Sequence, residues 1–407
     1  METLRIALAS DWFYPKVGGI EAHMDELARN LIKAGHEPYV ITHDYRYIRP
    51  YGDGFPYPVK RFRAMLYLRK YHISLSPTQL WRINEFYKSI NFDITHIHSI
   101  YSPLALAVAN VSRGIRDVPV VATNHSFFGT PPLAEALRWE LRRHLKRVDH
   151  FIAVSTPVAR DTARLIGNLR RERPVTVIPN GIDVDFWRPP TDEERERARK
   201  NLRIRDEVVV FYVGRMTKRK MAHRLPRVIK RAIEISGIPL RRVRFIAVGE
   251  GEMRDEFVRN VRDSGIGPIT DLFGFLPREK LQEFYWASDI VLMPGVLEAF
   301  PVVGLEAMAS GRAIVGRVES GLSDMVVNGT TGYLGRSEDE LSERLAELFT
   351  DEDTLVKMGI AGRKRAVECF SWRVILRRVL RVYRSTLNMA EEFDRRYLLY
   401  KLARELK

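Results

Sequence analysis

The sequence has 407 residues, of which 45% are hydrophobic, so it is long enough for two or three domains that each bury a core. Its single cysteine, Cys369, excludes an internal disulfide framework and a cysteine-cluster metal site. A net charge of +15 favours an acidic partner, namely nucleic acid, an anionic membrane face or a phosphorylated small molecule. Because the basic residues come without a nucleic-acid-binding motif, we expect no nucleic-acid partner.

The hydropathy pattern predicts a cytoplasmic protein. No apolar stretch reaches the ~20 residues that span a bilayer. The first residues lack the charged, apolar and cleavage regions of a signal peptide. Any membrane contact is therefore expected to be peripheral, on the cytoplasmic face.

The first half begins with a strand at 4–10, a glycine-containing loop, a helix at 20–34 and a strand at 37–42. This order is typical of a βαβ unit with a parallel sheet. Gly18 and Gly19, at the end of the loop, let the backbone turn tightly or pass close to a ligand. The pair is not the dinucleotide-binding fingerprint, because the third glycine is missing.

A basic and aromatic span follows, with no acidic residue between Asp53 and Glu85. Its cationic and aromatic side chains are Lys60, Arg61, Phe62, Arg63, Tyr67, Arg69, Lys70, Tyr71, Trp81 and Arg82. Such a mixture suits an anionic membrane surface or a phosphorylated lipid head group. A solvated loop and helix face is the alternative, and the same two interpretations apply to the basic amphipathic helix at 131–147.

His125 lies in a loop after the predicted strand at 118–123. Open α/β sheets bind their ligands at the carboxyl ends of strands, so His125 is a candidate catalytic residue. The alternative is that it only braces the loop.

The second half restarts the pattern with a strand at 207–213, and the loop that follows contains Arg215 and Lys220. An arginine fork and a lysine point charge at this position could clamp a diphosphate. A solvated turn is the other interpretation.

Two carboxylates, Glu298 and Glu306, flank the start of a short helix predicted from Pro301 to Gly311. A helix N-terminus offers unpaired N–H groups and a positive dipole end, which together bind anions such as phosphate. Hydroxyl groups on either side of a diphosphate would then meet Glu298 and Glu306, as a nucleotide-sugar requires. The competing interpretation is a solvated loop residue and an ordinary helix surface position.

The chain ends in a basic helix or helix pair from 371 onward. The pattern therefore predicts an α/β protein with domains at 1–185 and 186–370 and a helical segment at 371–407.

These motifs, in this order, resemble those of glycosyltransferase family 4. The matching positions are Gly18, Gly19, His125, the 178–183 segment, Gly214, Arg215, Lys220, Glu298, Glu306 and the closing 370–372 segment. The resemblance implies a retaining, metal-independent sugar transferase of the GT-B fold. In this fold two Rossmann-like domains face a cleft, and the C-terminal helical segment crosses back and packs on the first domain. The resemblance also implies that the enzyme needs no cofactor and that the nucleotide-sugar is a substrate.

The resemblance also implies roles for individual residues. Arg215 and Lys220 would hold the diphosphate, Glu306 the ribose and Glu298 the transferred sugar. The backbone amides of Phe300, Val302 and Val303 would bind the distal phosphate. His125 would approach the sugar, and the acceptor would lie near Gly18 and Gly19.

Within the family, the segments 10–15, 18–23 and 298–300 are most similar to the subunit that transfers N-acetylglucosamine to phosphatidylinositol. A sugar or phospholipid acceptor is therefore expected. Met221 and Pro301 depart from the family pattern, which has glycine at both positions, and Pro301 removes one potential N–H donor to phosphate.

Three other functions are compatible with parts of this pattern. A nucleotide-sugar epimerase or a phosphorylase can share the fold, because a fold does not fix the chemistry. A non-enzymatic basic protein that binds membranes or nucleic acid would explain the charge alone.

Overall fold

The computed structural model describes residues 2–15, 18–44, 54–63, 66–68, 73–75, 79–127, 134–171 and 173–405. Arg69, Lys70 and Tyr71 of the basic span, and the start of the predicted helix at 131–147, lie outside these ranges. The chain divides into two compact units. The first unit is Met1–Gly181 with Trp372–Lys407, and the second is Ile182–Ser371, so the first boundary falls a few residues before the predicted one.

The first unit contains a seven-stranded sheet in the order β3-β2-β1-β6-β7-β8-β9, and every neighbouring pair is parallel. Strands β1 and β6 are paired through Ile6–Ile94 to Ala9–Ile97. The strands are β1 (Arg5–Ala9), β2 (Glu37–Asp44), β3 (Val59–Arg63), β6 (Ile94–His98), β7 (Val120–Asn124), β8 (His150–Ala153) and β9 (Val175–Val177). A short antiparallel pair, β4 (Leu66–Leu68) and β5 (Ile73–Leu75), lies outside this sheet.

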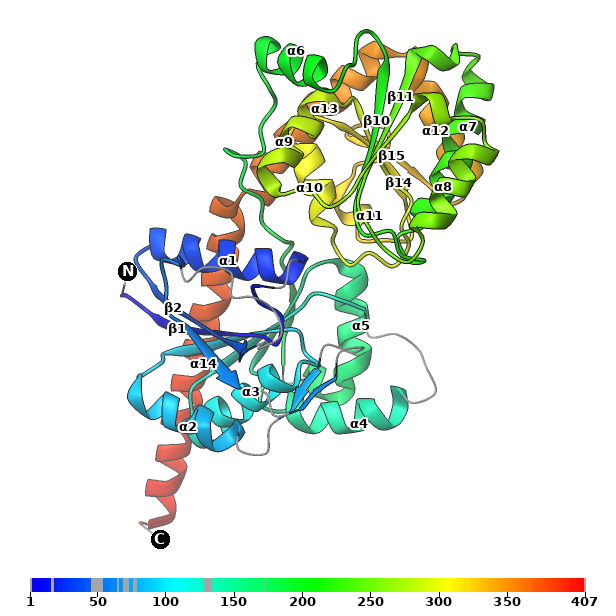
Figure 1. Ribbon diagram of the computed structural model, residues 1–407. Helices are drawn as coiled ribbons and strands as arrows, with labels where there is room; N and C mark the ends of the chain where they lie inside the picture. Colours follow the sequence, from blue (N-terminus) through cyan, green and yellow to red (C-terminus); the bar gives the residue numbers. More distant parts are fainter. Residues whose placement is uncertain are drawn as a thin grey trace. The chain divides into compact units, whose positions relative to one another are not determined.

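Helices cover both faces of this sheet, as expected for parallel strands that are buried on both sides (Figure 1). One core packs against α2 (Gln79–Ser89), α3 (Pro103–Ile115), α4 (Ala134–Leu145) and α5 (Thr156–Ile166). The other core packs against α1 (Gly19–Lys33) and α14 (Trp372–Glu405). The final segment is thus one helix, and its residues Ile375, Val379 and Tyr383 complete the core of the first unit.

The second unit contains a six-stranded parallel sheet in the order β12-β11-β10-β13-β14-β15. The strands are β10 (Val208–Val213), β11 (Val243–Val248), β12 (Thr270–Phe273), β13 (Ile290–Met293), β14 (Ala313–Arg317) and β15 (Gly332–Gly335). The helices are α6 (Asp192–Asn201), α7 (Leu225–Ser236), α8 (Arg254–Asp263), α9 (Arg278–Ala287), α10 (Val302–Ala309), α11 (Leu322–Met325), α12 (Glu338–Thr350) and α13 (Glu352–Arg365). Valine-rich strands such as β10 are typical of a sheet covered on both faces.

Local sequence signals account for the helix starts. Ser102 and Ser155 cap α3 and α5 by accepting backbone N–H groups, and Thr191 forms a capping box with Glu194 at α6. The predicted α/β class with two Rossmann-like parallel sheets is confirmed. No helix in the described part of the chain is long and apolar enough to cross a membrane.

Candidate active site

In the second unit, the strand order reverses between β10 and β13. Ligands of open α/β sheets bind at such a switch point, outside the carboxyl ends of the strands. The loop after β10 carries Lys220, and the loop after β13 carries Glu298. The two loops are joined by a hydrogen bond of 3.2 Å from the N–H of Val296 to the carbonyl of Arg219.

Lys220 and Glu298 form an ion pair, with 2.7 Å between Nζ and Oε2. The two side chains are only 20% and 10% exposed. The second carboxylate oxygen of Glu298, Oε1, is buried and accepts no hydrogen bond from any described residue. Because a buried acceptor without a donor is costly, this oxygen is well suited to receive a ligand hydroxyl.

The backbone around Glu298 is held by the turn after β14. The N–H of Gly321 donates to the carbonyl of Glu298 at 2.6 Å. A Cβ atom at Gly321 would lie 1.9 Å from the carbonyl oxygen of Ala299, so only glycine allows this approach. Leu297 adopts the left-handed conformation, with φ of 56°, and starts the bend that brings Glu298 inward.

Helix α10 begins directly after this loop, with Pro301 as its N-cap residue. The amides of Val302 and Val303 lie in the first turn, where N–H groups have no intrahelical partner. The side chain of Phe300 is buried and makes an edge contact with Phe370, with 5.6 Å between ring centroids. The side chain of Phe300 therefore belongs to the core, and the predicted phosphate contact concerns its backbone alone.

Glu306 lies on α10 and accepts a hydrogen bond of 2.8 Å from the hydroxyl of Tyr285 to Oε2. Tyr285, on α9, is fully buried. Burial, together with the negative charge of Glu306, holds the pKa of Tyr285 well above its usual value, so the hydroxyl stays protonated and donates. The sequence analysis missed Tyr285, because no local motif links a tyrosine on α9 to a carboxylate on the following helix.

Arg215 is exposed, and its guanidinium has no hydrogen bond or ion pair to any described residue. The hydroxyl of Tyr212 donates to the backbone carbonyl of Arg215 at 3.2 Å, which fixes the start of the loop. The structure thus brings Lys220 and Glu298 into direct contact and leaves Arg215 on the same loop as Lys220.

The other predicted residues belong to the first unit. Its strand order reverses between β1 and β6. Gly18 is the N-cap residue of α1 and Gly19 is its first residue, and both are exposed. The first N–H groups of α1 are therefore accessible to an anionic or hydroxyl-bearing ligand.

His125 follows β7 and is buried, with Nε2 only 3.0 Å from Nδ1 of His98. Its side chain also hydrogen-bonds with Asn180. Burial, reinforced by the neighbouring histidines His23 and His96, lowers the pKa of His125 well below 6.5. The imidazole is therefore neutral and can either donate or accept a hydrogen bond.

The sequence analysis missed the neighbours of His125. His96 and His98 stand two residues apart on β6, a spacing that places both on one face of the strand. Nδ1 of His96 is 2.7 Å from the hydroxyl of Tyr383, and Nε2 is 2.6 Å from the hydroxyl of Thr123. This spacing was the available signal, but it did not reveal that His23 on α1 packs against the same group.

Two family models match the chain. The model described as Glycosyltransferase Family 4 matches residues 17–186, and the model described as Glycosyl transferases group 1 matches residues 194–365. The chain belongs to glycosyltransferase family 4. The predicted family and the predicted sugar-transferase activity are therefore confirmed.

Three curated relatives of this family 4 member have names that specify different reactions. A D-inositol 3-phosphate glycosyltransferase of Corynebacterium aurimucosum is 28% identical, with 91% of this chain and 92% of the relative aligned. An alpha-maltose-1-phosphate synthase of Mycolicibacterium smegmatis is 30% identical, over 72% of this chain and 78% of the relative. The GPI3 subunit of the Saccharomyces cerevisiae phosphatidylinositol N-acetylglucosaminyltransferase is 26% identical, over 81% and 71%.

The crystal structure of Anabaena Alr3699/HepE in complex with UDP resembles this family 4 member with a TM-score of 0.77 at 18% identity. The alignment covers 94% of this chain and 100% of that chain. At this level of identity the likeness confirms the fold, which is the predicted GT-B class. The epimerase, phosphorylase and non-enzymatic hypotheses gain no support from these comparisons.

Proposed function

We propose that this glycosyltransferase moves a hexose or N-acetylhexosamine from a nucleoside diphosphate sugar to an acceptor that carries an inositol phosphate, either free or as a phospholipid. We further propose that it retains the anomeric configuration and uses no metal or other cofactor. The observation that carries the proposal is the Lys220–Glu298 pair at the switch point, in which Glu298 keeps one buried oxygen unpaired.

On the donor side, Lys220 binds the diphosphate without leaving Glu298. An ammonium group has three donors, so one can stay on Oε2 of Glu298 while another meets a phosphate oxygen. The unpaired Oε1 of Glu298 then accepts from a hydroxyl of the sugar. Glu306, oriented by the hydroxyl of Tyr285, accepts from the ribose.

The departure of the diphosphate drives the reaction in this proposal. Negative charge grows on the leaving phosphate, and Arg215, Lys220 and the first turn of α10 stabilise it. These groups are fixed before the reaction, which is the arrangement that contributes most to electrostatic catalysis. Retention follows when the acceptor attacks from the face that the leaving group vacates, while neutral His125 contacts the sugar.

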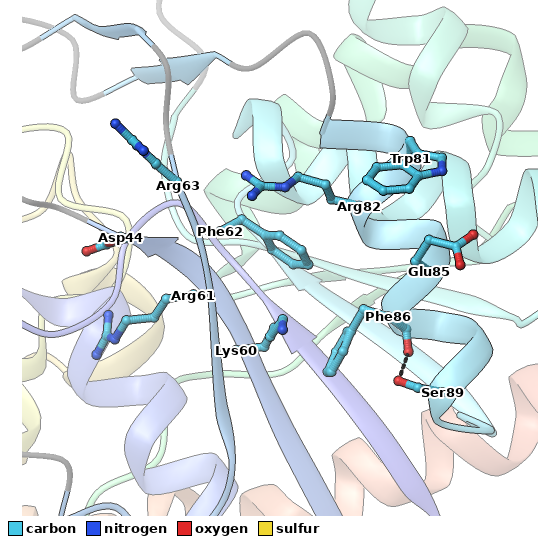
Figure 2. Close-up of a pocket in the computed structure, with 10 residues that line it drawn as sticks. All are labelled: Asp44, Lys60, Arg61, Phe62, Arg63, Trp81, Arg82, Glu85, Phe86 and Ser89. Atoms are coloured by element: carbon cyan, nitrogen blue, oxygen red, sulfur yellow. Dashed lines mark hydrogen bonds between the residues drawn. The ribbon is translucent and has the colours of Figure 1, made fainter.

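The acceptor assignment draws on two relatives, whose names specify D-inositol 3-phosphate and phosphatidylinositol. It also draws on a pocket of about 430 Å³ in the first unit, shown in Figure 2, between the edge strand β3 and helix α2. Four cationic and two acidic side chains line the pocket together with three aromatic ones: Lys60, Arg61, Arg63, Arg82, Asp44, Glu85, Phe62, Trp81 and Phe86.

This pocket combines positive charge with aromatic side chains. Arg63 and Arg82 have no hydrogen bond or ion pair to a residue that the structure describes, and both are exposed. Nζ of Lys60 lies 5.3 Å from the ring centroid of Phe86. Trp81, on α2, is 66% exposed. Exposed guanidinium groups that pair with no described residue, beside an exposed indole, suit the phosphate of an inositol phospholipid at an anionic, cytoplasmic membrane face.

The donor experiment measures turnover of uridine, guanosine and adenosine diphosphate sugars with the full chain. One donor class should be consumed only when an acceptor is present. Glu298→Gln preserves the shape of the side chain and should lower the transfer rate about a hundredfold, since it weakens hydrogen bonds to the sugar in the transition state. Consumption of the donor without acceptor, or full activity in this variant, contradicts the proposal.

The acceptor experiment compares soluble inositol phosphate with vesicles of phosphatidylinositol in phosphatidylcholine. Arg63→Ala and Arg82→Ala should each raise the KM for the acceptor about tenfold and leave the KM for the donor unchanged. Arg241→Ala, on an exposed turn of the second unit, is the matched charge control. Activity on the soluble acceptor alone rejects the lipid source, and equal KM values in all variants reject the pocket.

A further inference from the structure

Three histidines of the first unit gather into one buried group, which we call the histidine trio: His23, His98 and His125. They come from α1, the end of β6 and the loop after β7. One ring nitrogen from each lies within 4.8 Å of the others, and the side chains are 8%, 0% and 9% exposed. Separate segments of the chain thus converge on a single point.

The trio contains nitrogen atoms with no partner among the described residues. Nδ1 of His23 and Nε2 of His98 are buried and make no hydrogen bond. A buried polar atom without a partner is costly. A metal ion that takes the lone pair of Nδ1 of His23 would remove this cost for His23, and it would bind His98 and His125 in place of the hydrogen bond that they now share.

The chemistry of the trio selects the kind of ligand. Nδ1 of His98 and Nε2 of His125 are 3.0 Å apart, close to the about 3.3 Å between two nitrogens that bind one tetrahedral Zn²⁺ at 2.0–2.1 Å. Imidazole nitrogens suit Zn²⁺, Co²⁺, Ni²⁺ and Cu²⁺, whereas Mg²⁺ requires oxygen ligands.

The residues around the trio also favour a site with three protein ligands. The neighbouring His96 is not a fourth ligand, since Tyr383 and Thr123 occupy both of its ring nitrogens. The indole of Trp372 lies against His23, with 5.2 Å between ring centroids, and limits the movement of its ring. A three-histidine set with one open position is also the ligand set of several zinc enzymes.

We propose that the histidine trio binds one transition-metal ion of the Zn²⁺ class, with a water molecule as the fourth ligand, and that the bound ion inhibits sugar transfer by occupying His125. The inhibition rests on the proposed function, in which His125 contacts the sugar. The binding of the ion is independent of the proposed function.

The binding experiment uses the full chain after treatment with a chelator. Titration with Co²⁺ should give the visible absorption of a tetrahedral complex at one ion per chain, and Zn²⁺ should abolish it, whereas Mg²⁺ should not. His23→Gln and His98→Gln should each weaken binding tenfold or more, with circular dichroism to verify the fold. His144→Gln, at a half-exposed histidine on α4 of the same unit, should bind as the parent does.

Absence of the cobalt spectrum, or unchanged affinity in both trio variants, overturns the site. The activity experiment then adds Zn²⁺ to the transfer assay. Inhibition at the concentration that displaces Co²⁺ supports the regulatory half of the proposal, and full activity of the zinc-loaded chain rejects it. If the metal-free chain transfers no sugar to any acceptor, the proposed function fails while the result for the metal site stands.

Discussion

The Lys220–Glu298 pair allows a quantitative test in which Lys220 is replaced by Met. This change leaves Glu298 only 8% exposed and without its cation. Breaking a buried pair costs 3–5 kcal/mol and breaking an exposed one at most about 1 kcal/mol. With side chains that are 20% and 10% exposed, we expect the free energy of unfolding to fall by about 2–3 kcal/mol.

The same substitution should weaken the binding of a nucleoside diphosphate. A charge-assisted hydrogen bond is worth about 1.5–3 kcal/mol, which corresponds to an increase in Kd of about 10- to 150-fold. Glu298, no longer neutralised, would also repel the phosphates. The double variant Lys220→Met/Glu298→Gln should therefore lose about 1–2 kcal/mol less than the sum of the two single variants.

Isothermal titration calorimetry measures this cycle with whichever of UDP, GDP and ADP the parent chain binds. A nucleoside diphosphate has no transferred sugar, so the proposed hydroxyl contact of Glu298 does not enter the result. Lys218→Met, in the same loop and exposed, is the matched control and should bind normally. A coupling energy below about 0.5 kcal/mol, or equal losses for Lys218 and Lys220, would refute the reasoning.

Three further substitutions test other parts of the structure. Gly321→Ala should displace the loop that carries Glu298, because the added Cβ would overlap a backbone carbonyl oxygen, and should raise the Kd for the donor at least tenfold. Gly267→Ala is the control: its Cβ meets no atom within 4 Å, so neither Kd nor Tm should change. Tyr285→Phe removes the donor to Glu306 and should raise the donor Kd about 3- to 10-fold with little change in kcat, as separate binding and rate measurements would reveal. Burial lowers the pKa of His150 to about 4, so on acidification the unfolded chain binds a proton at this histidine before the folded chain does. The free energy of unfolding should therefore fall as the pH drops from 6.5 to 4. His150→Gln should reduce that loss by roughly 2 kcal/mol, as measured by chemical denaturation at each pH. An unchanged pH dependence in this variant would exclude His150 as the cause.

The fold class could be predicted from the sequence because buried parallel strands leave long apolar runs between helical segments. Strand β3 was not predicted, because it lacks such an apolar run. Its residues Val59–Arg63 are three cations and only two apolar residues, and it lies at the edge of the sheet, where charge is favourable because it prevents pairing with other chains. The sequence analysis interpreted this charged segment either as a contact for an anionic membrane or lipid head group or as a solvated loop and helix face, and predicted no strand there.

The site could be predicted only in part. Lys220 follows a strand that the pattern identified, and Glu298 precedes a helix that it identified. Adjacent parallel strands bring the loops that follow them together. The contacts of Tyr285 and of His23 depend on how helices pack across many residues, and no spacing in the sequence encodes that packing. The role of Gly321 was also hidden, since a glycine in a turn has many explanations until the carbonyl that it approaches is known.

Helix α14 determines which parts of the chain can be exchanged as a unit. Because Tyr383 and its neighbours complete the core around β1 and β6, a fragment that stops at Gly181 would lack one cover of its sheet and expose apolar side chains to water. The Ile182–Ser371 segment, by contrast, is continuous. If the proposed function is correct, engineering that aims to exchange donor preference between relatives can replace this segment as a single insert, whereas an exchange on the proposed acceptor side must transplant both ends of the chain together.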